Sequence, residues 1–174
     1  AYMTLDAIKK GTLHWDDKVE MSEYAYALTQ DPQASNIAVK DPTEAFSIRD
    51  LFNAAMIQSA NSAAITLAEK IGGSEPKFVD MMKTQLAYWG ITDGKLVNAS
   101  GLNNSVLGKN IYPGSSETDE NKLSAKDLAI IAQHLIRDFP EVLEVTKQTV
   151  AIFDKGGASE QTLATYNYML PSLP

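Results

Sequence analysis

Four stretches of the chain repeat apolar residues at the spacing of an amphipathic helix, three or four positions apart. The expected helices begin after Ser47, near Asn61, after Ser74 and after Ser124. Serine is a favoured N-cap residue, and Asp50 and Asp127 stand where the second member of a capping box belongs. The second and third helices are expected to end before glycines and the fourth before Pro140. The pattern therefore predicts a mainly helical fold.

The apolar side chains of the first and last of these helices form the clearest stripes. They are Ile48, Leu51, Phe52, Ala55 and Met56 in the first, and Leu128, Ile131, Ala132, Leu135 and Phe139 in the last. We expect all four helices to share one core that includes Phe52 and Leu128. Replacing either residue by alanine should then cost about 2 to 5 kcal/mol.

The two ends of the chain look like the interior of a larger domain. Residues 1–10 have a helical pattern that ends at Gly11, but no capping residue precedes it. At the other end, the apolar stretch 166–170 is followed by Pro171-Ser172-Leu173-Pro174. We expect the sequence to have been cut from a longer one, with residues 1–174 forming a single truncated domain.

Short extended segments are expected where β-branched residues alternate with polar ones. These segments are Lys18–Met21, Asn36–Val39, Lys95–Val97 and Thr149–Phe153. Residues 103–122 are rich in Gly, Asn and Ser and have no apolar period, so a surface loop is expected there. The fold class is accordingly mainly α with short β segments.

Composition excludes several classes of function. The 174 residues carry 15 Lys and Arg against 22 Asp and Glu, a net charge of −7, which disfavours binding to a nucleic-acid backbone. With no cysteine, the chain has no disulfide, thiolate zinc site or cysteine nucleophile. The usual zinc-binding and nucleotide-binding motifs are absent too, so we expect no metal and no cofactor. No signal peptide and no membrane-spanning apolar run are recognisable in the sequence.

The most informative polar residues lie at the joint between the first two of these helices, at Ser59-Ala60-Asn61. Capping is the ordinary explanation, because Ser59 or Asn61 could each accept a hydrogen bond from the first turn of the second helix. The flanking alanines, however, suggest a tightly packed setting in which polar groups persist only when they are satisfied or functional.

Ser59-Ala60-Asn61 resembles the S-x-N element of the penicillin-recognising serine enzymes, in particular the D-alanyl-D-alanine carboxypeptidases. Further segments resemble that family in the same order along the chain: Tyr2–Gly11, Phe78–Met82, Leu96–Leu102 and Leu123–Ala129. The resemblance implies the helical part of the α/β penicillin-recognising serine transpeptidase and β-lactamase-like fold.

The family's two other motifs are missing from these residues. S-x-x-K should precede S-x-N and K-T-G should follow it. The only S-x-x-K match, Ser74–Lys77, comes after S-x-N and is better interpreted as a helix cap. The nearest approximations to K-T-G are Lys155-Gly156-Gly157, expected to be a turn, and Lys83-Thr84-Gln85, expected to lie on a helix surface. We therefore expect the chain to be inactive alone, as the truncated helical region of a carboxypeptidase catalytic domain.

The resemblance also implies roles and partners. Ser59 would relay a proton to the leaving amine, and Asn61 would donate its side-chain amide to a substrate carbonyl, which makes both catalytic and Asn61 also substrate-binding. The longer parent would trim peptidoglycan stem peptides ending in D-Ala-D-Ala, react with β-lactam antibiotics, and work outside the cytoplasm, facing the cell wall from a membrane anchor.

Two alternatives stay open at this point. A serine β-lactamase is disfavoured because class A enzymes have S-D-N where this chain has Ala60. In a noncatalytic helical binding module, Ser59 and Asn61 would be caps only. The parent reading frame separates an enzyme from the binding module, because only an enzyme requires S-x-x-K upstream and K-T-G downstream.

Overall fold

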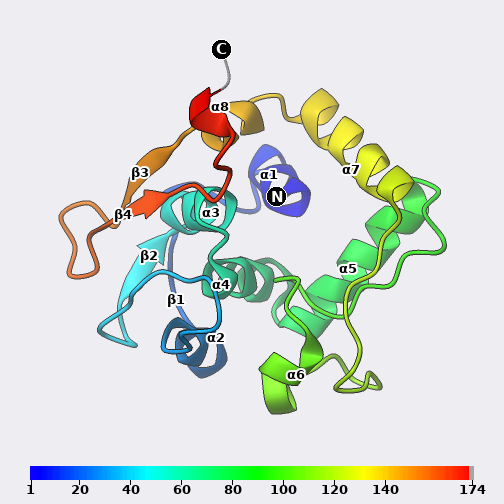
Figure 1. The fold of residues 1–174 in the computed structure, drawn as a ribbon, viewed down its shortest axis with the longest axis horizontal. Coiled ribbons are helices and arrows are strands. Elements are labelled where there is room, and N and C mark those ends of the chain that lie inside the picture. Colours follow the sequence, from blue (N-terminus) through cyan, green and yellow to red (C-terminus); the bar gives the residue numbers. More distant parts are fainter. Residues whose placement is uncertain (173–174) are drawn as a thin grey trace.

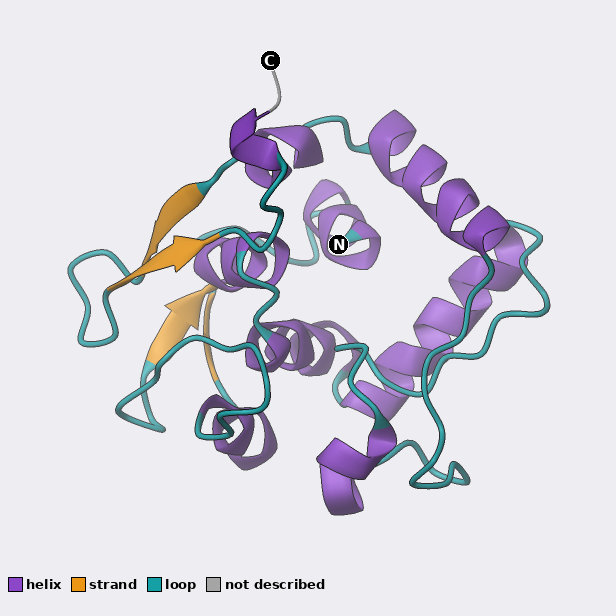
Figure 2. Cartoon of the chain, in the orientation of Figure 1, coloured by secondary structure: helices purple, strands orange, loops and turns teal. Residues whose placement is uncertain are grey.

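The computed structural model describes residues 1–172, and most of its regular elements are helices (Figure 1, Figure 2). In chain order they are α1 (Tyr2–Lys9), β1 (Lys18–Glu20), α2 (Glu23–Thr29), β2 (Ala45–Ser47), α3 (Ile48–Ile57), α4 (Asn61–Gly72), α5 (Glu75–Tyr88), α6 (Asn104–Leu107), the 3-10 helix η1 (Gly108–Asn110), α7 (Ala125–Asp138), α8 (Val142–Thr146), β3 (Val150–Phe153), β4 (Gln161–Ala164) and the 3-10 helix η2 (Leu170–Ser172). The expected class, mainly α with short β segments, is confirmed.

Helix α4 is the hub of the helical arrangement, because it contacts α1, α2, α3 and α5. Its alanines Ala63 and Ala68 are fully buried, and their small side chains let the neighbouring helices approach closely. The main core continues through Phe52 of α3 to the strands, where Phe46 and Phe153 pack with their ring centroids 4.9 Å apart.

The strands form two separate antiparallel ribbons rather than one sheet. In the first, β1 pairs with β2 and Lys18 lies opposite Ser47. In the second, β3 pairs with β4 and Val150 lies opposite Ala164. Both ribbons contact α3. Strand β2, which precedes α3, and strands β3 and β4, which follow it, therefore pack against the same helix.

The predicted helix starts after Ser47, Ser74 and Ser124 are confirmed. The Ser47 Oγ accepts a hydrogen bond from Asp50 N at 3.0 Å, and Ser124 and Asp127 form a reciprocal capping box. The Ser74 Oγ accepts from Lys77 N at 3.4 Å. Ser74–Lys77 is thus a helix start, as expected, and Lys155–Gly157 is the turn that joins β3 to β4.

The expectations that α7 buries its whole stripe and that all four helices share one core are wrong. Val79 and Leu86 of α5 lie in a second buried cluster, apart from the main core. Leu128 is 55% exposed, Ala132 is also exposed, and only Phe139, just beyond the helix, is fully buried. Figure 1 shows α7 at the periphery of the molecule. The half-buried Ile131 packs on the α5 cluster, and nearer the C-terminal end the His134 ring stacks on Trp89 and Asp138 accepts a hydrogen bond from the hydroxyl of Tyr2. Periodicity shows that a helix has an apolar face, not how completely the fold covers it.

The short segments were predicted less well than the long helices. Strands β1 and β3 match their predictions, and Lys95 forms a single bridge with Lys122. Residues 36–39 are not a strand, because the main chain of Ala38 pairs with the Gln161 side chain instead of with a neighbouring strand. The expected loop 103–122 contains α6 and η1, and β2, β4, α2 and α8 were not predicted.

Candidate active site

The Ser59–Asn61 turn joins α3 to α4 through a left-handed residue. Ser59 has φ 57°, a conformation that side chains other than Gly and Asn adopt only at a cost of about 1 to 3 kcal/mol. The N–H of Ala60 reaches back to the carbonyl of Ala54 at 3.1 Å, which closes the end of α3. Helices often end on such a residue, but it is usually glycine. Here the position carries an exposed serine, so the turn presents a hydroxyl group to solvent.

Neither Ser59 nor Asn61 caps α4, so the capping interpretation of these two residues is wrong. The N-cap residue is Ala60, and within residues 1–172 no side chain of the turn accepts a hydrogen bond from the first amides of α4. The expected burial of the triplet holds for two of its members. Ala60 is 1% and Asn61 8% exposed, whereas Ser59 points to solvent.

Asn61 is held by two hydrogen bonds to a single carbonyl group. Its backbone N–H and its side-chain Nδ2 both donate to the carbonyl oxygen of Ser35, each at 2.9 Å. A side-chain amide has two donor hydrogens and one acceptor oxygen. One hydrogen on Nδ2 and the oxygen Oδ1 therefore have no hydrogen-bond partner among the described residues, and the first of these is the donor that the proposed substrate contact requires.

Three residues that the sequence did not indicate hold this turn in place. The Ser35 Oγ donates to the carbonyl of Gln58 at 2.7 Å, and the Gln58 Nε2 donates to the carbonyl of Asn36 at 2.8 Å. The Asn36 Oδ1 accepts from Ser62 N at 2.8 Å. These partners lie more than twenty positions apart, and no periodicity or motif marks Ser35 or Asn36 in advance.

Among the described residues, Ser59 has no hydrogen bond to a lysine or histidine that could serve as its base. The nearest sequence matches to catalytic lysines, Lys77 and Lys155, lie on the surface at a helix start and in a turn. The turn therefore contains a hydroxyl and an amide, which can position a substrate and pass on a proton, but it contains no activated nucleophile.

The acidic side chains with raised pKa values are not hydrogen-bonded to this turn. Burial raises the pKa of Asp154, and a hydrogen bond and the charge of Glu44 raise it further, although Ser159 N opposes this by donating to its carboxylate. Ser159 also donates to Glu44 through its N–H and its hydroxyl. Burial likewise raises the pKa of Glu75. No cluster of three or more metal-ligating side chains occurs in residues 1–172.

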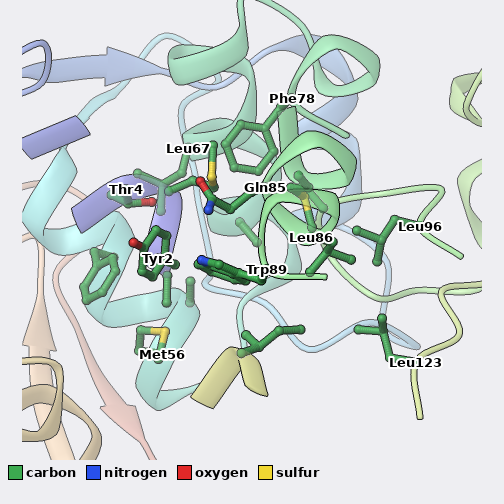
Figure 3. A pocket seen from close by; sticks show the side chains of 18 residues that line it. Tyr2, Thr4, Met56, Leu67, Phe78, Gln85, Leu86, Trp89, Leu96 and Leu123 are labelled. Atoms are coloured by element: carbon green, nitrogen blue, oxygen red, sulfur yellow. The ribbon is translucent and has the colours of Figure 1, made fainter. Parts of the chain in front are cut away.

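An apolar cavity of about 200 Å³ lies between α1, α3, α4, α5 and α7 (Figure 3). Figure 3 shows its wall of large apolar side chains, among them Leu67, Phe78 and Trp89, with Thr4 and Gln85 as polar members. Neither Ser59 nor Asn61 lines it. The cavity is a packing feature between helices and is distinct from the candidate site.

No helix in the described part of the chain has both the length and the apolar character needed to cross a bilayer.

Comparison with known proteins points to one family. The sequence profile of the S11 peptidases, described as D-alanyl-D-alanine carboxypeptidase, matches residues 1–171. The chain is 30% identical over 156 residues to D-alanyl-D-alanine carboxypeptidase DacA of Haemophilus influenzae, covering 89% of this chain and 35% of that protein. It is 28% identical over 157 residues to DacC of Escherichia coli, covering 89% and 36%. The chain thus spans about a third of the length of these curated relatives.

Solved structures show the same fold. A peptidoglycan synthesis regulatory factor (PBP3) from Streptococcus pneumoniae superposes with a TM-score of 0.91 at 45% identity, covering 99% of this chain and 46% of that one. Penicillin-binding protein D2 from Listeria monocytogenes in its cefotaxime-bound form superposes with a TM-score of 0.77 at 28% identity, covering 99% and 61%.

Proposed function

Because the chain belongs to the S11 family of D-alanyl-D-alanine carboxypeptidases, we propose that the whole protein is a serine peptidase that removes the terminal D-alanine from peptidoglycan stem peptides. The family and the fold class inferred from the sequence are confirmed by this membership and by the structural superpositions. Residues 1–174 are, in this proposal, the helical region of the catalytic domain.

The observation that carries the proposal is the conformation of the Ser59–Asn61 turn. Ser59 is in a left-handed conformation that glycine would adopt without strain, and Asn61 keeps a free amide hydrogen beside it. A turn that served only to connect two helices would not need a serine at this φ. Strained residues of this kind are concentrated at active and ligand-binding sites, where the surrounding structure holds them.

Ser59, Asn61 and the missing nucleophile each have a role in the proposed reaction. In the whole protein, a serine of an S-x-x-K segment attacks the carbonyl carbon of the penultimate D-alanine, with the lysine amine of that segment accepting its proton. The peptide bond breaks, and the Ser59 hydroxyl relays a proton to the departing amine of D-alanine. The Asn61 Nδ2 donates to a substrate backbone carbonyl and fixes the peptide against the nucleophile. Water then hydrolyses the ester and restores the serine.

The same site would react with β-lactams, and it would face the cell wall. A β-lactam presents a strained amide where the stem peptide presents its scissile bond, so the ester forms and persists. The Listeria relative is reported in a cefotaxime-bound form, which supports this proposal. The substrate lies outside the cytoplasm, and we therefore propose an extracytoplasmic, membrane-anchored parent.

The two alternatives are less well supported. The binding-module interpretation required Ser59 and Asn61 to be caps, but Ala60 is the N-cap. For a class A β-lactamase, an aspartate would occupy position 60. Ala60 is 1% exposed, and an aspartate at that place would need a buried partner for its charge.

The test is Asn61→Ala in the whole protein. Loss of one positioned donor should slow acylation by a D-Ala-D-Ala peptide by about a hundredfold, or about 3 kcal/mol. Loss of the bond to Ser35 should lower the free energy of unfolding by only about 1 kcal/mol. Asn103→Ala is the matched control, because the Asn103 side chain is exposed and forms no hydrogen bond among residues 1–172. An unchanged acylation rate per folded molecule in Asn61→Ala would refute the assignment.

A further inference from the structure

We propose that Asn36 is a positioning residue for catalysis, which holds the Ser59–Asn61 turn in its strained conformation from outside both helices. This inference rests on the proposed function. It assigns a task to a residue that belongs to an irregular segment, 30–44, between α2 and β2 and carries no recognisable motif.

Asn36 supplies the cap that α4 lacks. Ser62 is the second residue of α4, and its N–H is one of the first-turn donors that have no partner within a helix. The Asn36 Oδ1 accepts from that N–H at 2.8 Å. The other end of the same side chain donates to the carbonyl of Leu28 at 2.7 Å, just before the end of α2. The amide is therefore fixed at both ends, and its orientation is set by α2.

The main chain of Asn36 acts on the opposite side of the turn. Its carbonyl accepts from the Gln58 Nε2 at 2.8 Å, and the neighbouring Ser35 Oγ donates to the Gln58 carbonyl at 2.7 Å. Asn36 thus contacts the residue before Ser59 and, through Ser62, the first turn of the helix that follows. The Ser59 conformation persists only if the groups on either side cannot rotate, and these bonds restrict both sides.

The same bonds connect the turn to the second ribbon. The Gln58 Oε1 accepts from Ala164 N of β4 at 3.2 Å. The segment 30–44 also holds Asn61, because the backbone N–H and the side-chain amide of Asn61 both donate to the Ser35 carbonyl. If Asn36 releases Ser62 and Gln58, the Ser59 hydroxyl and the Asn61 amide lose their fixed relation while the helices stay packed.

The experiment compares Asn36→Ala with Asn36→Asp and with Asn103→Ala in the whole protein. Aspartate keeps an oxygen acceptor for Ser62 N at a helix N-terminus, where a negative charge is favourable, but it has no donor for the Leu28 carbonyl. Asn103 is an exposed asparagine whose side chain makes no hydrogen bond within residues 1–172. Two quantities are measured: hydrogen exchange of a peptide covering residues 57–64, and the rate constant of acylation by a fluorescent penicillin, corrected for the folded fraction.

We expect Asn36→Ala to raise exchange in residues 57–64 about tenfold, as for the loss of one or two buried hydrogen bonds, and to slow acylation at least tenfold. Exchange in α5 should not change. Asn36→Asp should recover both quantities only in part, because it keeps the acceptor for Ser62 N and loses the donor to the Leu28 carbonyl, and Asn103→Ala should change neither. If Asn36→Ala does not fold, Gln58→Ala, which removes the bonds of that side chain to the Asn36 carbonyl and to Ala164 N, should give the same local exchange and slower acylation.

Two results would overturn the inference. One is a hydrogen-exchange rate at residues 57–64 of Asn36→Ala that equals the rate in the natural protein. The other is faster exchange throughout the protein with an unchanged acylation rate of the folded fraction, which would make Asn36 a purely structural residue. If the natural protein is not acylated by penicillin at all, the proposed function fails, and the role of Asn36 in catalysis fails with it. The local exchange result then shows only whether Asn36 holds the turn.

Discussion

Phe52 and Leu128 each belong to an apolar helical stripe, but their replacement by alanine should have very different effects. Phe52 is 2% exposed and lies in the main core, whereas Leu128 is 55% exposed on α7. We expect Phe52→Ala to lower the free energy of unfolding by about 4 to 5 kcal/mol, near the upper end for such a change. Leu128→Ala should cost about 1 kcal/mol or less.

The magnitude for Phe52 has two main parts. Returning a fully buried aromatic side chain to water costs about 1.5 to 3 kcal/mol. Removing the ring leaves about 100 Å³ unfilled, which at about 24 cal/mol per Å³ adds about 2.4 kcal/mol. The edge-on contact with Trp15, with centroids 5.4 Å apart, is lost as well. Phe52 already borders the cavity of about 200 Å³, so the new void enlarges an existing one.

The free-energy cost of an unfilled cavity does not apply to Leu128. Less than half of its side chain is removed from water, which limits the transfer cost to about 1 kcal/mol. A truncated side chain on an open face leaves no enclosed void, because water fills the space.

Circular dichroism measures both variants, by urea unfolding for the free energies and by thermal unfolding for the melting temperatures. In a chain of this size each kcal/mol shifts the melting temperature by about 2 to 4 °C, so Phe52→Ala should melt about 10 °C or more below the natural protein and Leu128→Ala within about 4 °C of it. Comparable losses in the two variants would contradict the peripheral position of α7. A small loss in Phe52→Ala would mean that the core collapses around the missing ring.

Two further predictions concern protonation and reactivity. Folding raises the pKa of Asp154, so the stabilisation by its protonated form is present below the unfolded pKa of about 3.9 and is lost as pH rises through the folded value. Asp154→Asn should therefore unfold at higher urea than the natural chain at pH 7 and lose that advantage near pH 4; an advantage independent of pH would contradict this. The 174-residue chain by itself should form no covalent penicillin adduct, because Ser59 has no hydrogen-bonded base among the described residues, and an acyl mass increment in intact-mass spectrometry would disprove this.

Local chemistry made the helix boundaries predictable. Ser47, Ser74 and Ser124 act on amides three positions away, and a signal of that range can be read from a sequence. Whether α7 buries its stripe depends on which elements pack against it, and no pattern within residues 125–138 contains that information. The exposure of Leu128 therefore became visible only in the structure.

The candidate site was predictable in part, for the same reason. The order of family segments singled out Ser59 and Asn61, but the tripeptide by itself favoured a cap. Two facts about the backbone exclude the cap: the φ of 57° at Ser59 and the N-cap position of Ala60. The support from Asn36 joins residues 26 positions apart, and no pattern of neighbouring residues marks such a contact.

In the proposed reaction, the left-handed conformation of Ser59 would place stability and activity under opposing selection at one codon. Glycine would relieve the backbone strain, and so to a lesser degree would asparagine, whereas only serine supplies the hydroxyl at this φ. A library randomised at this codon and sorted for folded protein alone should drift toward glycine. The same library sorted for growth that depends on wall trimming should return to serine. The difference between the two enrichments would measure, in units of fitness, how much the cell needs that hydroxyl group.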